Sequence, residues 1–60
     1  MKLYHIIELS WDGHNYTPDR IRTFSTEQAR NAMCDKIRQY TSYMKGDIDF
    51  LVFENEPDKE

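Results

Sequence analysis

A chain of 60 residues forms one small domain, and a domain of this size buries only about 60% of the surface that its unfolded chain exposes. Small domains are usually stabilised by disulfides, a metal ion or another chain, and the single cysteine excludes an internal disulfide. The potential metal ligands, Asp12, His5, His14 and Cys34, lack the paired close spacing of a structural zinc site. We therefore expect no metal or cofactor, and a contact with another chain.

Charge is uneven along the chain, whose formal net charge is −3. The first 46 residues hold seven bases and five acids, whereas the last 14 hold six acids against one lysine. Those acids are Asp47, Asp49, Glu54, Glu56, Asp58 and Glu60. The molecule is thus expected to have an acidic end and a mildly basic flank.

The segment Lys2–Trp11 alternates in the manner of a β-strand and has no apolar core or cleavage site of a targeting signal. With the free thiol, this start favours the cytoplasm, that of the host cell if the gene is carried by a phage. One face of the strand carries Leu3, His5, Ile7, Leu9 and Trp11, and the other carries Tyr4, Ile6 and Glu8. His5 is interpreted as a packed, hydrogen-bonded residue.

Residues 12–19 have the composition of turns, with Gly13 and Pro18 among Asp, Asn and Thr. We expect a loop longer than a tight hairpin, with Trp11, His14 and Tyr16 at its base as a possible contact surface. A second, short strand follows at Arg20–Phe24. Its Ile21 and Thr23 share one face and its Arg20, Arg22 and Phe24 the other, which suits an edge strand.

The segment from Ser25 to Gly46 is predicted to be a single amphipathic helix. Ser25 is the expected N-cap, with Gln28 completing a capping box and Phe24 and Ala29 spaced as a hydrophobic staple. Lys45 and Gly46 provide the signals for its end. An apolar stripe runs through Ala29, Met33, Ile37, Tyr40 and Met44.

The third strand is expected from Asp47 or Ile48 to Phe53, with Ile48, Phe50 and Val52 on one face and Leu51 and Phe53 on the other. The domain is expected to span residues 1–54, and residues 55–60, which include Pro57, to form an acidic tail.

The order strand, strand, helix, strand predicts an α+β fold. A right-handed crossover makes the third strand parallel to the second, and placing it beside the first gives a three-stranded antiparallel sheet in the order 2-1-3. One helix covers one face of this sheet.

The uncovered face is the basis of the functional prediction. We expect Leu3, Ile7, Leu9, Ile21, Ile48, Phe50 and Val52 to lie under the helix. Tyr4, Ile6, Leu51 and Phe53, with Arg22 and Phe24, would then form an exposed apolar and aromatic patch, which small proteins usually keep only where something binds. A different strand register, with the tail folded over this patch, is the alternative.

Enzymatic chemistry is not indicated, because the chain has two glycines, no phosphate loop and no carboxylate pair. Cys34 lies one helical turn from both Arg30 and Arg38, which would favour its thiolate, but no base accompanies it.

Two other classes of function stay open. One is a nucleic-acid-binding regulator that uses Arg20, Arg22, Arg30 and Arg38 with Tyr4 and Phe53, although the acidic net charge opposes phosphate binding. The other is a homodimeric structural module.

In size, charge and layout the chain resembles the small acidic inhibitors encoded by phages and mobile elements, such as anti-CRISPR proteins. The resemblance is carried by the six C-terminal acids and the exposed aromatic residues. It implies a non-enzymatic protein that occludes a surface of a host protein, for example a nucleic-acid-binding protein whose phosphate contacts the acids imitate. The predicted partner-binding residues are Tyr4, Ile6, Trp11, Arg22, Asp47, Asp49, Leu51, Phe53, Glu54 and Glu56.

Overall fold

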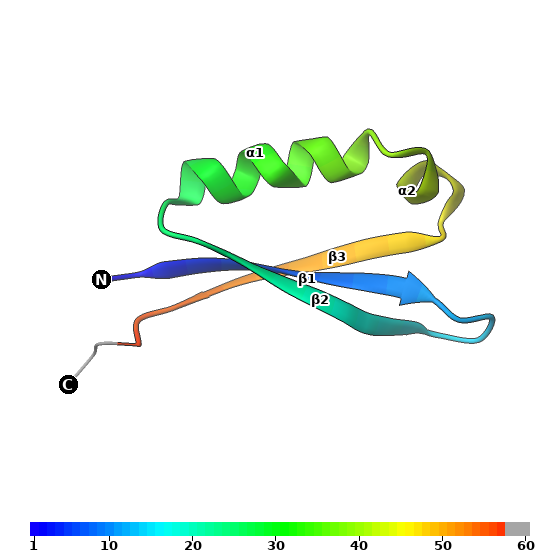
Figure 1. Cartoon of the computed structure of the whole chain (residues 1–60), viewed down its shortest axis with the longest axis horizontal. Helices are drawn as coiled ribbons and strands as arrows, with labels where there is room; N and C mark the ends of the chain where they lie inside the picture. The colour runs from blue at the N-terminus through cyan, green and yellow to red at the C-terminus, as the bar shows by residue number, and fades with distance from the viewer. Residues whose placement is uncertain (58–60) are drawn as a thin grey trace.

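The structure, a computed structural model, describes residues 1–57. Its elements are β1 (Leu3–Trp11), β2 (Tyr16–Phe24), α1 (Glu27–Arg38), α2 (Thr41–Lys45) and β3 (Ile48–Asn55). The three strands form one antiparallel sheet in the order β2-β1-β3, and both helices lie on the same side of it (Figure 1). The predicted α+β fold and strand order are confirmed.

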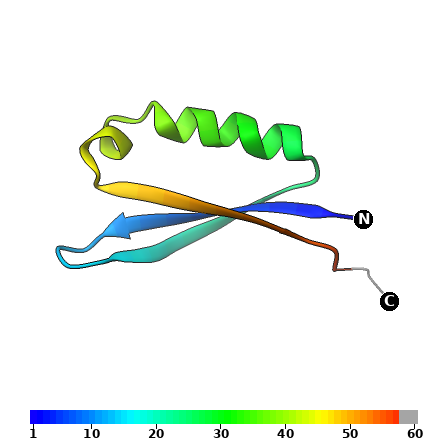
Figure 2. The same cartoon turned by 180° about the vertical axis from the view of Figure 1, so that it is seen from behind.

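The two sides of the sheet differ plainly in what covers them. Figure 1 and the view from behind in Figure 2 show α1 and α2 above the strands and no element below them. The chain ends of the described part lie at one end of the sheet, opposite the β1–β2 turn. The fold is therefore two layers, with one sheet face open.

The hydrophobic core lies between α1 and the sheet and is small. Ile6, Cys34 and Ile37 are its buried members, and Ile6 and Ile37 have almost no exposed surface (0% and 1%). Partly buried apolar residues surround them: Phe24, Met33, Tyr43, Ile48 and Phe50. Ile6 therefore faces the helix, and so do the residues at even positions of β1.

The orientation predicted for β1 and β2 was wrong, and that for β3 was right. Tyr4 lies 5.5 Å beneath the Arg30 guanidinium, and its cross-strand neighbour Phe24 packs against the core. The row of β1 that was expected under the helix instead faces away from it, together with Ile21. On β3, Phe50 faces the helices, with its ring 5.8 Å from Tyr43.

The predicted single helix is two. Thr26, not Ser25, is the N-cap of α1, and its hydroxyl accepts a hydrogen bond from the Ala29 N–H at 3.1 Å. The chain leaves the helical conformation at Tyr40, which is extended (φ −69°, ψ 140°). The residues that follow, Thr41 and Ser42, are weak helix formers, and Thr41 is β-branched.

The other element boundaries differ less from the prediction. Gly46 ends α2 in the left-handed conformation (φ 86°), as expected. Strand β2 begins four residues earlier than predicted, because Pro18 and Thr17 pair with β1 and a bulge opposite Glu8 and Leu9 absorbs the irregularity. Asn55 belongs to β3, and the acids Asp58 and Glu60 of the predicted tail lie outside the described residues.

Candidate protein-binding face

The uncovered side of the sheet, here called the open face, is formed by the odd-numbered positions of β1 and by their cross-strand neighbours. Its residues are Leu3, His5, Ile7, Leu9, Trp11, Tyr16, Pro18, Ile21, Thr23, Asp49, Leu51, Phe53 and Asn55. Several large apolar members are well exposed: Ile21 (61%), Leu51 (57%), Trp11 (47%) and Phe53 (42%). These residues form an apolar surface that no described helix or strand covers.

A polar cluster occupies one end of the open face and is satisfied from within. His5 contacts Thr23 Oγ1 through Nδ1 (3.0 Å) and Asn55 Oδ1 through Nε2 (2.5 Å). Since a carbonyl oxygen only accepts, Nε2–H donates to Asn55, and Nδ1 accepts from the Thr23 hydroxyl. The His5 ring also stacks on Phe53, with ring centroids 4.5 Å apart. The two hydrogen bonds of the His5 ring are therefore made within the chain and do not depend on a partner.

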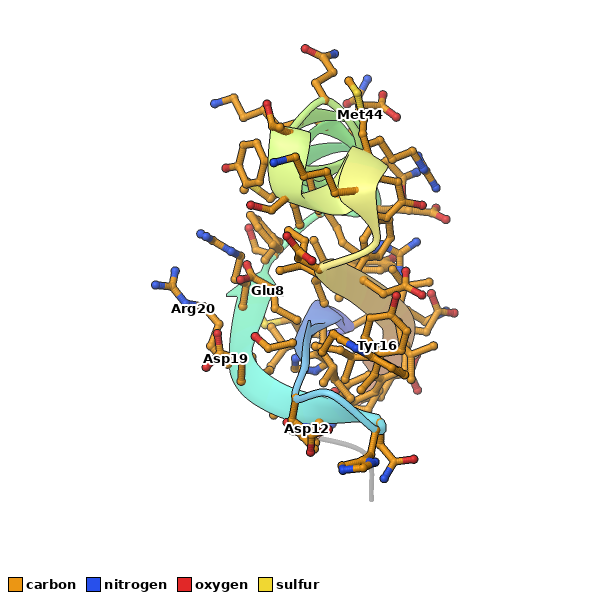
Figure 3. The ribbon with its side chains drawn as sticks, turned by 90° about the vertical axis from the view of Figure 1, so that its right-hand side faces the viewer. Glu8, Asp12, Tyr16, Asp19, Arg20 and Met44 are labelled. Atoms are coloured by element: carbon orange, nitrogen blue, oxygen red, sulfur yellow. The ribbon has the colours of Figure 1, made fainter. Side chains whose placement is uncertain are left out.

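The other end of the open face carries an aromatic pair. Trp11 and Tyr16 are cross-strand neighbours with ring centroids 5.0 Å apart in an edge-to-face arrangement. The Tyr16 hydroxyl donates to the Gly46 carbonyl oxygen at 2.6 Å, which fixes the ring against the end of α2. Figure 3 shows Tyr16 on the sheet side and Met44 on the outer side of the helices. The pair gives this end a rigid aromatic surface.

Basic residues are segregated on the helix side. Arg20 and Arg22 occupy helix-side positions of β2, where both pair with Glu8, and the remaining described bases lie on the helices or at Lys2. Arg30 and Arg38 pair with Glu27 (3.5 Å) and Asp35 (3.0 Å). Among residues 1–57, no lysine or arginine thus belongs to the open face.

The acidic residues predicted to bind a partner are divided between the two sides of β3. Asp49 belongs to the open face, where its carboxylate accepts a hydrogen bond from the Phe50 N–H at 2.8 Å. Glu54 lies on the helix side and pairs with Lys2 (3.4 Å), which holds the pKa of Lys2 above its ordinary value. Asp47 and Glu56 are exposed beyond the two ends of the strand.

The predicted site is therefore brought together only in part. The open face contains Trp11, Asp49, Leu51 and Phe53 of that set, whereas Tyr4, Ile6 and Arg22 belong to the helix side. The prediction missed Leu3, Ile7, Leu9 and Ile21, which it placed under the helix. No local signal in the sequence distinguishes the two rows of β1, because both contain large apolar side chains.

The described residues contain one cysteine and no cluster of potential metal ligands. Cys34 is 4% exposed and lies in the core with Ile6 and Ile37 rather than at a reactive rim. In residues 1–57, no three His, Cys, Asp or Glu side chains are grouped so that they could hold a metal ion. Within the same residues, neither helix is both long and apolar enough to cross a membrane.

The nucleic-acid platform considered from the sequence is not assembled in one place. Its four arginines and Tyr4 are on the helix side or on α1, and Phe53 is on the opposite face. In comparisons with known proteins, no family model, curated protein or solved structure matches this chain. The open face is therefore the feature of the molecule that indicates a function.

Proposed function

We propose that this chain is a non-enzymatic protein-binding module that contacts another polypeptide through the open face of its sheet. The single observation that carries the proposal is the half-buried apolar row of β1 on the uncovered side of the sheet, with the exposed side chains of Ile21, Leu51 and Phe53 beside it. Full burial of one such side chain stabilises by about 1.5–3 kcal/mol. Several together supply enough free energy to offset the entropic cost of association.

The open face also has the composition of a binding surface in its polar and aromatic content. Trp11, Tyr16 and Phe53 are of the residue types enriched at protein interfaces, and Asp49 is the one charged strand residue of the face. The polar cluster of His5 brings its own hydrogen-bond partners. Burial of this face against an apolar surface therefore leaves few groups unsatisfied.

The most specific version of the proposal is an inhibitor or regulator that occludes a surface of a host protein. The small size of the chain suits a protein that acts by covering a site. Asp47, Asp49 and Glu56 place negative charge along and beyond β3, which favours a partner with basic residues beside an apolar patch. A nucleic-acid-binding protein is one such partner.

An affinity capture from host lysate tests the proposal, with intact protein and with Phe53→Asp as bait. We expect Phe53→Asp to lose the partner, because the carboxylate would be buried in an apolar contact. Met44→Asp is the matched control, because Met44 is 71% exposed on the outer side of α2. Equal capture by the intact protein and by folded Phe53→Asp would contradict the proposal.

Binding to oligonucleotides separates this proposal from a nucleic-acid-binding regulator. We expect no salt-dependent binding to single-stranded or double-stranded oligonucleotides, since the open face has no described lysine or arginine. Tight binding at low salt that weakens steeply with added salt would favour the regulator instead.

A further inference from the structure

The open face is large enough for a dimer interface. Nine-residue strands at the usual rise and spacing give a three-stranded face of about 30 by 14 Å. With protruding side chains, two such faces in contact bury on the order of 1,200 Å², the lower end of the range for specific complexes. A sheet-on-sheet contact between two copies therefore has the area that a stable dimer needs.

The open face is also compatible with a copy of itself. Because it has no described lysine or arginine, stacking two copies buries no basic side chain. Asp49, the one charged strand residue, lies toward the loop end and away from the centre, which is occupied by Ile7 and its neighbours Ile21 and Leu51. His5, Thr23 and Asn55 bond to one another within each copy. Self-stacking thus brings apolar centre against apolar centre.

The single copy is less compact than a typical domain of its length. Its radius of gyration is 12.8 Å, whereas a compact chain of this length has one of about 10 Å. The fully buried core consists of two isoleucines and one cysteine. Small domains with so little core are commonly completed by oligomerisation.

The edges of the sheet are less suited to self-association than its open face. Strand β2 has Pro18 and a bulge, both of which disfavour pairing with a further strand. On β3, the outward Phe50 N–H is already bonded to Asp49. The open face is therefore better suited than either sheet edge to bind a second copy.

We propose that a second copy of this chain covers the open face, so that two sheets stack between two outer layers of helices. The inference rests on the proposed function, which assigns the open face to protein contact. A two-fold axis through the centre of the face brings Ile7 of the two copies close together, since Ile7 is in the middle of the central strand. A foreign partner then competes with dimerisation for the same surface.

Sedimentation equilibrium between about 1 and 200 μM tests the proposal. We expect the mass to rise with concentration to twice the chain mass of 7.3 kDa. Leu51→Asp and Ile21→Asp should weaken self-association at least a hundredfold, whereas Met44→Asp should leave it unchanged. A monomer at 200 μM overturns the proposal, and so does a dimer that survives both open-face substitutions.

A second measurement needs no substitution and stays decisive if those variants unfold. Isotope-filtered nuclear Overhauser spectra of an equal mixture of ¹³C-labelled and unlabelled protein report contacts between copies only. We expect such contacts for the methyl groups of Ile7, Ile21 and Leu51 and none for Met44 or Ala29. Intermolecular contacts from the helix side alone would overturn the proposal.

Failure of this inference and failure of the proposed function give different results. A monomer whose Phe53→Asp variant loses a captured partner supports the binding function and rejects the dimer. A dimer through the open face whose Phe53→Asp variant captures the same proteins as the intact chain supports the dimer and rejects the assigned partner site.

Discussion

Ile6 is the residue that joins the two layers. It has no exposed surface, and its side chain lies in the core cluster with Cys34 and Ile37. Around it the helix side of the sheet carries the apolar residues Phe24, Ile48 and Phe50. It also carries an ion pair between Glu8 and Arg22, one cross-strand step away. The helices therefore cover Ile6 and Tyr4 of the central strand and an ion pair, while the longer apolar row of β1 lies on the open face.

Truncation of Ile6 tests this placement. Ile6→Ala should lower the free energy of unfolding by about 2–5 kcal/mol, because it leaves a cavity in a core of three buried residues. Ile21→Ala, which shortens a side chain that is 61% exposed, should cost much less in dilute monomer. Urea unfolding of both variants at low concentration compares them, and similar losses would contradict the assigned orientation of β1.

Asp12 makes the β1–β2 turn sensitive to acid. The backbone N–H groups of Asn15 and His14 donate to its carboxylate at 2.8 Å each and hold its pKa below the ordinary value of 3.8. A lowered folded pKa means that the charged carboxylate stabilises the fold at neutral pH, and that this stabilisation is lost as the pH falls through the lowered pKa.

Asp12→Asn isolates that contribution, because the amide oxygen can accept the same two hydrogen bonds without a charge. We expect the intact protein to be more stable than Asp12→Asn at pH 6, and the difference to shrink below about pH 4. Chemical unfolding across this pH range measures it. A difference that does not change with pH would show that the Asp12 charge contributes nothing.

The orientation of β1 relative to the helix could not be predicted from the residues of this strand. Both rows of this strand contain large apolar side chains, so alternation defines two faces without telling which one meets the helix. The longer row was assigned to the core on hydrophobicity alone. The decision depends on tertiary contacts, such as Arg30 over the Tyr4 ring, that no local pattern encodes.

At the scale of elements, α1 owes its start to Thr26 and its end to the extended Tyr40. The break lets α2 turn back over the sheet, so that Tyr43 contacts Phe50 before the chain enters β3. The apolar periodicity of residues 29–44 continues through the break, which is why the sequence predicted one long helix. The pattern predicted correctly that residues in this segment are helical, but it did not predict the break at Gln39 and Tyr40, because element boundaries are weakly encoded in apolar periodicity.

The two neighbouring hydroxyl residues at the start of α1 give a direct test of the cap. Thr26→Ala should lower the free energy of unfolding by about 1 kcal/mol, because the Ala29 N–H loses its side-chain acceptor. Ser25→Ala should have little effect. Thermal or urea unfolding of the two variants measures this contrast. A larger decrease in the free energy of unfolding for Ser25→Ala would show that Ser25 is the N-cap, as the sequence predicted.

At the scale of the whole molecule, the strand order 2-1-3, obtained by placing the third strand beside the first, was predicted correctly. The sequence also predicted that one face of the sheet stays open, because one helical layer covers one face only. What the sequence could not provide was the identity of the exposed residues, since reversing β1 and β2 exchanges the two apolar rows. The prediction of an uncovered apolar face survives that exchange, and the face becomes more apolar by it.

Self-association should appear in the stability of the intact protein. If two copies cover each other's open face, unfolding is coupled to dissociation, and a tenfold increase in concentration should raise the thermal midpoint by about 4 °C. Calorimetry at 10, 100 and 500 μM measures this shift, with Leu51→Asp as the variant expected to show none. If the thermal midpoint of the intact protein does not depend on concentration, the protein folds as a monomer and the dimer is contradicted.

The most direct test of the account is site-specific photo-cross-linking in cells, with benzoylphenylalanine at position 51 or position 44. Both residues are well exposed, but Leu51 belongs to the open face and Met44 lies on the outer side of α2. We predict a discrete adduct from position 51, to a second copy or to a foreign protein, and none from position 44. Adducts from position 44 alone, or from neither position, would contradict the claim that the open face is the surface through which this protein acts.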